Sequence, residues 1–445
     1  MRMNLVGLGV VVSLGVWAAG CTVKAADNSG SDGGSGGPGD GGGTDPGDAG
    51  ATEDVATVPT ATIDAPQILN AGGPVMATPK IVPIYFGNDA FQAQLTTFLG
   101  KLPKSTYWKT IASEYGVGDV TVAPAVVATE KAPTTAQDHG DPTAVSAVKT
   151  FLQTHLDGAH PGWPAADENA IYTVFYPATT TVKLDTAASC VQFGGYHNET
   201  TVGAKKIVYA ILPRCSGSPD GLGDFEELTV ATSHELFEAV SDPYPFSAAA
   251  FNLPDNDHLV WQDFPLPELA DMCSANVDAN AQSAELGFTV QRMWSNKAAR
   301  EGHNPCVPEL AAKPAYFNAI PQFTDSVPFN FSDNNGVTKI VNTKGIKLAV
   351  GQSKTIPVKL FADGQAAPWT VGGVDLASRL DPSGQTPPEL TFTVDKDTGA
   401  AGDTIQMTIT RASSATSDIG GSSFLIVSKQ GKSGPAFFWT GFVAE

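Results

Sequence analysis

The stretch ATSHELFEAVSDP, Ala231–Pro243, decides how the first half of this chain folds and what it can bind. It closes a longer segment, Phe225–Val240, which suits a helix whose apolar positions are Leu228, Val230, Leu236, Phe237 and Val240. The Ser-Asp-Pro that follows ends this pattern, because proline cannot continue a helix. The sequence therefore predicts a helix over Phe225–Val240.

The charged residues of this helix follow the pattern H-E-x-x-E, at His234, Glu235 and Glu238. Residues four apart lie on one helix face, so His234 and Glu238 can reach the same metal ion. The pattern differs by one letter from the H-E-x-x-H of zinc peptidases, whose Glu is the general base. Zinc also accepts a Glu oxygen. His234 and Glu238 are therefore predicted zinc ligands and Glu235 a predicted catalytic base; the alternative is an ordinary charged helix.

A third ligand is expected in PELADMC, Pro267–Cys273. Glu268 and Asp271 are three residues apart, a spacing that places both on one side of a helix. In zinc peptidases whose third ligand is a Glu, a later helix carries it and an Asp supports it. By that analogy Glu268 is the third ligand and Asp271 its orienting partner, with Asp271 as the alternative ligand. Asp242 and His258 are outlying candidates, and another divalent cation is the alternative to zinc.

Length and charge limit the classes of protein and partner. The chain has 445 residues, enough for two or three domains that each have a core. It carries 46 acidic against 26 basic residues, a formal net charge of -20. Nucleic acid is excluded as a partner, because phosphate binding needs a basic surface.

The N-terminus has the features of an export signal. Arg2 is followed by the apolar run Leu5–Val16 and by AAGC, Ala18–Cys21, which resembles the end of a bacterial lipoprotein signal. The apolar run is short for a bilayer core of about 30 Å. Residues 1–20 are therefore expected to be removed, and Cys21 to be lipidated and to anchor a monomer in the cell envelope, at the outer membrane or cell surface. The alternative is an ordinary signal peptide cut nearby.

Residues 21–60 are predicted to be a flexible tether, because their Gly, Ser, Asp and Pro residues offer little to bury. The four later cysteines are even in number, which favours disulfides in an exported chain. The pairs Cys190–Cys215 and Cys273–Cys306 are preferred because each closes a local loop. No C-x-x-C occurs, which disfavours a thiolate zinc site.

Two folded regions follow. In residues 61–321, apolar strand-like runs alternate with helical patterns, which predicts an α+β or α/β domain. The expected strands are Ile81–Gly87, 119–128, Ala170–Pro177 and Lys205–Pro213, and the expected helices Phe91–Leu102 and Pro142–Leu156. Residues 322–445 instead contain short alternating strands with Gly, Asp and Pro between them, which predicts an all-β, Ig-like sandwich.

Six segments in the first region, in the same order, resemble the Exordium-like, phosphate-induced protein family of plant cell walls and bacterial exported proteins. They are Gly72–Gly87, Tyr107–Gly116, Cys190–Asn198, SHELFEAVSDP, PELADMC and Phe288–Asn296 followed by Cys306. The resemblance implies a zincin-like mixed α/β domain with H-E-x-x-E on its metal helix. It leaves the tether and the C-terminal region uncovered, and it implies no particular activity. Asp242 stands where plant members often have Asn.

The same resemblance draws attention to His197, which would face the cleft and stabilise a developing oxyanion. Its alternative is a buried histidine hydrogen-bonded within the fold. Two functions are then expected. One is a lipid-anchored, metal-dependent hydrolase, most similar to a zinc metallopeptidase, acting on protein or polysaccharide. The other is a non-enzymatic surface protein that binds polysaccharide or protein around a structural metal or none. An open coordination position beside a cleft distinguishes them, because structural sites are closed.

Overall fold

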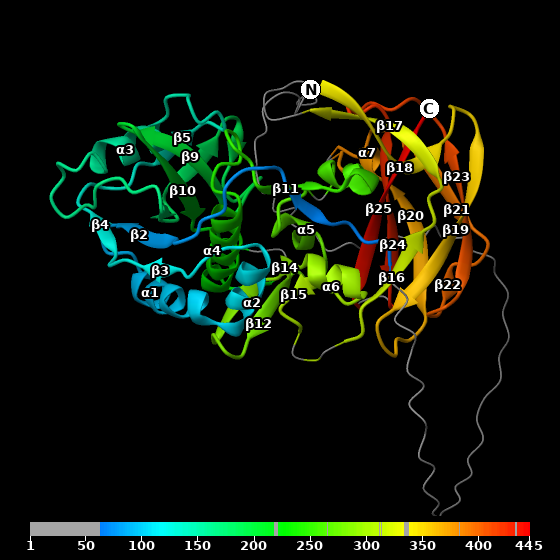
Figure 1. Cartoon of the computed structure of the whole chain (residues 1–445), viewed down its shortest axis with the longest axis horizontal. Coiled ribbons are helices and arrows are strands. Elements are labelled where there is room, and N and C mark those ends of the chain that lie inside the picture. The colour runs from blue at the N-terminus through cyan, green and yellow to red at the C-terminus, as the bar shows by residue number, and fades with distance from the viewer. Residues whose placement is uncertain are drawn as a thin grey trace, which may run out of the picture.

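A computed structural model describes residues 63–217, 221–264, 266–310, 312, 314–332, 338–381, 383–431 and 434–445. The expected signal peptide, lipidated Cys21 and tether lie outside these residues. In the part of the chain that is described, no helix is both long and apolar enough to span a membrane. Figure 1 shows two lobes side by side, one of helices around a sheet and one made almost entirely of strands.

The first lobe is built on a mixed sheet with the strand order β3-β2-β6-β10-β9. Strands β2, β6 and β10 are parallel, and β9 runs antiparallel to β10 at the edge. Nearly every residue of these strands is buried, as expected for a sheet covered on both faces. Their bounds are β2 Lys80–Phe86, β6 Ala170–Tyr176, β9 Tyr196–Val202 and β10 Lys205–Pro213.

Successive residues of β2 pack on opposite faces of this sheet. Ile81 and Tyr85 join a core that includes α1 (Gln92–Lys101), α2 (Thr106–Glu114) and α4 (Asp224–Ser241). Val82 and Ile84 join a second core with α3 (Ala147–His155). The predicted helix over Phe225–Val240 is therefore confirmed as α4, and it packs against β10 and the edge strand β9.

Two sequence predictions in this lobe are wrong in detail. Residues 119–128 form two short strands, β3 (Thr121–Val122) and β4 (Val126–Ala128), which both pair with β2. Pro124 lies between them and has no N–H group for a continuous ladder. Helix α3 begins at Ala147 rather than Pro142, because the Ser146 Oγ accepts a hydrogen bond from the Lys149 N–H and caps the helix there.

Short elements link the two lobes and fill the sheet's surroundings. A small sheet joins β5, β7 and β8, and β1 pairs with β11. Their bounds, with the remaining elements up to β15, are β1 Ile68–Asn70, η1 Leu102–Lys104, β5 Thr135–Asp138, β7 Thr181–Leu184, β8 Ala187–Ala188, β11 Phe251–Pro254, η2 Asn256–Gln262, α5 Asp271–Ser274, β12 Asn280–Ser283, β13 Phe288–Gln291, β14 Met293–Trp294, α6 Asn296–Glu301 and β15 Cys306–Val307.

The second lobe confirms a β-sandwich in its coarse form. A four-stranded sheet contains β16 Phe317–Pro321, β19 Ser353–Ala362, β23 Thr404–Arg411 and β21 Leu390–Val394. A six-stranded sheet contains β17 Asp325–Ser332, β18 Thr338–Lys347, β25 Ala436–Ala444, β24 Ser422–Lys429, β20 Trp369–Asp375 and β22 Thr398–Gly399, with α7 (Leu376–Arg379) after β20. Because β16 pairs with β19, the sandwich begins at Phe317 and not at residue 322.

The two lobes share one apolar core. The ring of Trp261, in η2, lies 5.9 Å from the ring of Phe438 and 5.9 Å from that of Trp439, both in β25. Trp294 lies 6.2 Å from Trp261 on the side of the first lobe. These tryptophans are buried core residues, so they are not exposed platforms for a substrate.

Candidate metal centre

Five carboxyl groups and two imidazoles converge where α4, β9 and α5 meet. Helix α4 supplies the H-E-x-x-E residues, β9 supplies a histidine, and the segments after α4 and before and within α5 supply the other acids. All seven side chains are buried: His197, His234, Glu235, Glu238, Asp242, Glu268 and Asp271. Burying this many carboxyl groups together is unfavourable unless cations or protons compensate them.

One group of three donors has the spacing of a zinc site. The Nε2 atom of His234 lies 3.1 Å from Glu238 Oε2 and 3.5 Å from Asp271 Oδ1. In a tetrahedral site with bonds of about 2.0–2.1 Å, neighbouring ligand atoms are separated by about 3.3 Å. The buried atoms His234 Nε2, Glu238 Oε2 and both carboxylate oxygens of Asp271 have no hydrogen-bond partner. Buried polar atoms are normally paired, so these unpaired atoms fit a shared cation.

A glutamine fixes the protonation of His234. The His234 Nδ1 lies 2.8 Å from Gln291 Oε1, and Gln291 Nε2 donates to the Ala270 carbonyl at 2.7 Å. Since an amide oxygen only accepts, Nδ1 carries a proton. Nε2 faces Glu238 and Asp271 and can hold either a second proton or a metal ion. No local pattern in the sequence marks Gln291, which is one of two polar residues in the four-residue strand β13.

Replacing Gln291 by Leu is expected to weaken zinc binding about 10–100-fold, because the imidazole of His234 loses the acceptor that orients it. The measurement is competition for zinc against a chelator dye. The control is Gln282→Leu on the neighbouring strand β12, where the Gln282 side chain accepts from Thr289 instead. Equal zinc affinities for the two variants would contradict the role given to Gln291.

Of the two acids, Asp271 lies in the donor group around His234 and Glu268 does not. Glu268 belongs to neither of the two three-residue groups that could hold an ion among the described residues. Its Oε1 instead lies 3.7 Å from His197 Nε2. The expectation that both acids share a helix is wrong, because α5 begins only at Asp271 and Glu268 precedes it in a bend after Pro267. The outlying candidate His258 bonds to Asp255 away from this cluster.

Glu235 lies beside both histidines of the cluster. Its Oε1 is 3.9 Å from His234 Nε2, and its Oε2 is 3.7 Å from His197 Nδ1. Gly195 makes room for it, because a Cβ there would lie 2.8 Å from Glu235 Cγ. His197 is fully buried and faces these carboxylates, so in this structure it does not line an open cleft. The Asp242 carboxylate accepts a hydrogen bond from the Ala250 N–H at 2.7 Å. The backbone carbonyl of Asp242 accepts one from His197 Nε2.

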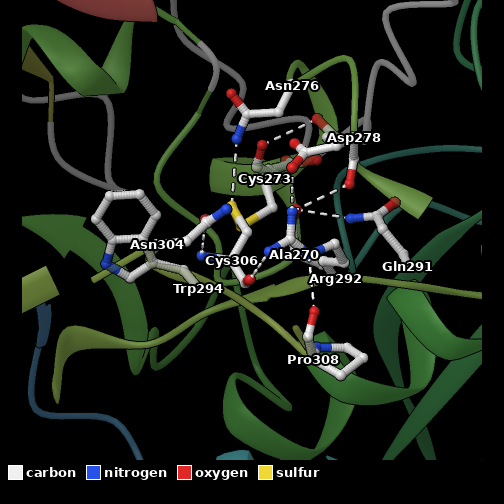
Figure 2. The surroundings of a disulfide bond; sticks show 12 residues. Ala270, Cys273, Asn276, Asp278, Gln291, Arg292, Trp294, Asn304, Cys306 and Pro308 are labelled. Carbon is white, nitrogen blue, oxygen red and sulfur yellow. Dashed lines mark hydrogen bonds and ion pairs between the residues drawn. A yellow bond between two sulfur atoms is a disulfide. The ribbon is translucent and has the colours of Figure 1, made fainter. Parts of the chain in front are cut away.

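A disulfide joins the helix that carries Asp271 to strand β15. Both predicted pairs are confirmed, with Cα–Cα distances of 5.2 Å for Cys190–Cys215 and 5.7 Å for Cys273–Cys306. Figure 2 shows Cys273–Cys306 beside Arg292, whose Nε donates to the Pro308 carbonyl at 2.9 Å and whose Nη2 donates to the Cys306 carbonyl. Cys273 lies within α5, so this bond fixes the helix that presents Asp271.

Removing Cys273–Cys306 by a double Cys→Ser change is expected to lower the free energy of unfolding by about 2–4 kcal/mol, because the unfolded chain gains freedom. It should also weaken zinc binding, since α5 is no longer held. The matched control removes Cys190–Cys215, which should cost a similar stability without changing zinc affinity. Urea unfolding and zinc competition measure the two quantities; equal losses of zinc affinity in both variants would contradict this account.

The electrostatics of the cluster show an excess of negative charge. Burial raises the pKa of Asp271 well above its usual range, and the nearby charge of Glu238 adds to this. Burial likewise raises the pKa of Glu268, with Glu238 contributing next. For His234, burial alone would lower the pKa, but the carboxylates of Glu238 and Glu235 outweigh it and raise the pKa. Without a cation, the folded protein therefore favours the protonated forms of all three groups.

The cation-free protein is consequently expected to lose stability as the pH rises. A carboxyl group whose pKa is higher in the folded than in the unfolded protein destabilises the fold when it ionises. The loss of stability therefore begins near the unfolded pKa of about 4 and is complete above the folded pKa. The raised pKa of His234 adds a contribution that is present below about 6.5 and disappears above its folded pKa. Zinc competes with these protons, so the stability gained from zinc should grow with pH.

Urea unfolding of chelator-treated and zinc-loaded protein between pH 5 and 8 measures both trends. The control is Gln282→Leu, whose site is intact and which should reproduce the wild-type curves. Cation-free stability that rises across this range, or a zinc effect that is larger at pH 5, would contradict the charge balance described here.

The centre is closed in this structure. Its donor residues are at most 4% exposed. The cavities beside α3, in the sandwich and at the junction of the lobes are lined by other residues. Any reaction at this centre therefore requires a movement that admits the substrate.

No protein-family model and no curated protein matches this chain. A solved structure of a conjugative transposon lipoprotein from Bacteroides eggerthii is 13% identical and covers 28% of this chain and 95% of its own. Its TM-score is 0.15, at which the likeness carries no argument about fold or function.

Proposed function

We propose that this chain is an exported, lipid-anchored protein of the cell envelope whose first lobe is a zincin-like, metal-dependent hydrolase, in the manner of a zinc peptidase. The observation that carries the proposal is the set of buried, unpaired donor atoms of His234, Glu238 and Asp271 at the spacing of a tetrahedral site. Glu235 lies next to that set.

The proposed chemistry assigns a role to each residue. His234, Glu238 and Asp271 would hold the zinc ion, which would supply a Lewis acid for polarising a carbonyl and lowering the pKa of water. Glu235 accepts a proton from the attacking water and later gives that proton to the leaving amine. Gln291 holds the imidazole of His234 in the orientation and tautomer that ligation needs. The sandwich then binds the substrate or wall material, or acts as a spacer.

A second function has one observation in its favour. The donor residues of the centre are almost fully buried, which is typical of a structural metal site with no open position. On this alternative the ion stabilises the first lobe of a surface protein that binds polysaccharide or protein. On this alternative Glu235 has no catalytic role.

One experiment separates these functions. The purified protein is stripped with a chelator, reloaded with one equivalent of zinc and incubated with unlabelled casein, and mass spectrometry identifies new peptide termini. The proposal expects termini that appear only with zinc. Zinc that binds, raises the melting temperature and produces no termini supports the structural alternative. No zinc binding at all contradicts both metal-based functions.

A further inference from the structure

His197, like His234, faces Glu238 with one ring nitrogen while the other ring nitrogen is hydrogen-bonded. Its Nε2 lies 3.1 Å from the carbonyl oxygen of Asp242, which only accepts, so Nε2 carries a proton. Its Nδ1 has no hydrogen-bond partner although the side chain is buried. That nitrogen is 3.7 Å from Glu235 Oε2 and 3.8 Å from Glu238 Oε2. The Nδ1 side of the buried ring therefore faces two carboxylates at distances longer than a hydrogen bond.

These atoms form a second group of donors for a metal ion. The ligand atoms of His197, Glu235 and Glu238 lie within 4.8 Å of one another. Glu238 Oε2 is shared, because it lies between His197 Nδ1 and His234 Nε2, at 3.8 and 3.1 Å. A carboxylate between two ligand sets is the arrangement in which two ions are held about 3.5–4 Å apart.

The negative charge of the cluster also favours a second cation. Five buried carboxyl groups surround the two imidazoles, and one divalent ion compensates two negative charges. Both oxygens of Glu268 lack hydrogen-bond partners, and Oε1 lies 3.7 Å from His197 Nε2. Unpaired buried carboxylates of this kind are costly, so further positive charge at this side of Glu238 is favourable.

We propose that His197, Glu235 and Glu238 hold a second divalent cation, bridged by Glu238 to the ion at His234. This inference rests on the metal site of the proposed function and adds its regulation. The second ion occupies the Glu235 oxygen that faces His197, so it removes the general base. Hydrolysis is therefore highest when only the first site is filled and falls when excess cation fills the second.

The test is equilibrium dialysis of the stripped full-length protein against zinc, with the bound ions counted by mass spectrometry. Wild type is expected to bind two ions per chain and His197→Ala one. The control is His258→Ala, because both ring nitrogens of His258 already have partners, at 2.8 Å from Asp255 Oδ1 and 3.0 Å from the Asp64 carbonyl. One ion on the wild type, or two on His197→Ala, overturns the second site.

A measurement on the wild type alone protects this test from misfolding of a variant. Protein loaded with two equivalents of Mn²⁺ should give the electron paramagnetic resonance spectrum of an exchange-coupled pair, because Glu238 bridges the ions. Spectra of isolated Mn²⁺ only would overturn the bridge. Two coupled ions in excess cation, with no hydrolysis even at one equivalent, contradict the proposed function and not this inference. Hydrolysis by a protein that binds only one ion even in excess cation does the reverse.

Discussion

Replacing Glu235 by Gln is expected to lower the rate of hydrolysis about 10²–10⁴-fold, the usual contribution of a general base. The amide has nearly the shape of the carboxylate, so it fits the space beside Gly195. It cannot accept a proton from the attacking water. Glu235 is not one of the three donors grouped around His234, so zinc in the first site should be retained. The measurements are zinc content and the rate at which new peptide termini form from casein.

The matched control is Glu227→Gln, about two turns earlier in α4, in the first turn of the helix. It changes the same atoms on the same helix and should leave both quantities near wild type. A Glu235→Gln protein with unchanged activity would remove the base from the mechanism. A variant that loses its zinc at the first site would instead show that Glu235 is a ligand there.

Replacing Glu238 by Gln is expected to abolish the stability gained from zinc, because this carboxylate serves both groups of donors. A ligand at 100 times its dissociation constant stabilises a folded protein by about 2.7 kcal/mol. The variant should lose a gain of that order. Without zinc the variant should be as stable as wild type or more so, since one of the crowded buried carboxylates is gone.

Thermal and urea unfolding with and without zinc measure this prediction. Glu389→Gln is the control, because Glu389 is also a buried glutamate and accepts hydrogen bonds from Thr416 in the sandwich. Its response to zinc should equal that of wild type. If Glu238→Gln gains as much stability from zinc as wild type does, the ion is bound elsewhere.

Features that depend on local spacing could be predicted from the sequence. The period of apolar residues gave the helix that carries His234, Glu235 and Glu238, because helix geometry alone sets their shared face. The two disulfides were predictable because each joins cysteines separated by a short stretch of chain. The buried strands were predictable because each is a continuous run of apolar residues. The run over residues 119–128 is instead broken at Pro124, which has no N–H group for a continuous ladder.

Features that depend on how distant parts of the chain come together could not be predicted from the sequence. The choice between Glu268 and Asp271 turns on where a four-residue helix begins, which the spacing of two acids does not determine. Gln291 reaches His234 from a strand far along the chain, and no local pattern marks such a partner. The near-complete burial of His197 follows from the packing of β9, α4 and the segment after it.

The most direct test of the metal centre is anomalous diffraction from crystals grown with one equivalent of zinc, recorded on both sides of the zinc absorption edge. The account predicts a peak about 2.0–2.2 Å from His234 Nε2 and from oxygens of Glu238 and Asp271. Crystals whose zinc signal lies elsewhere, or that show no zinc at these three side chains, would contradict it.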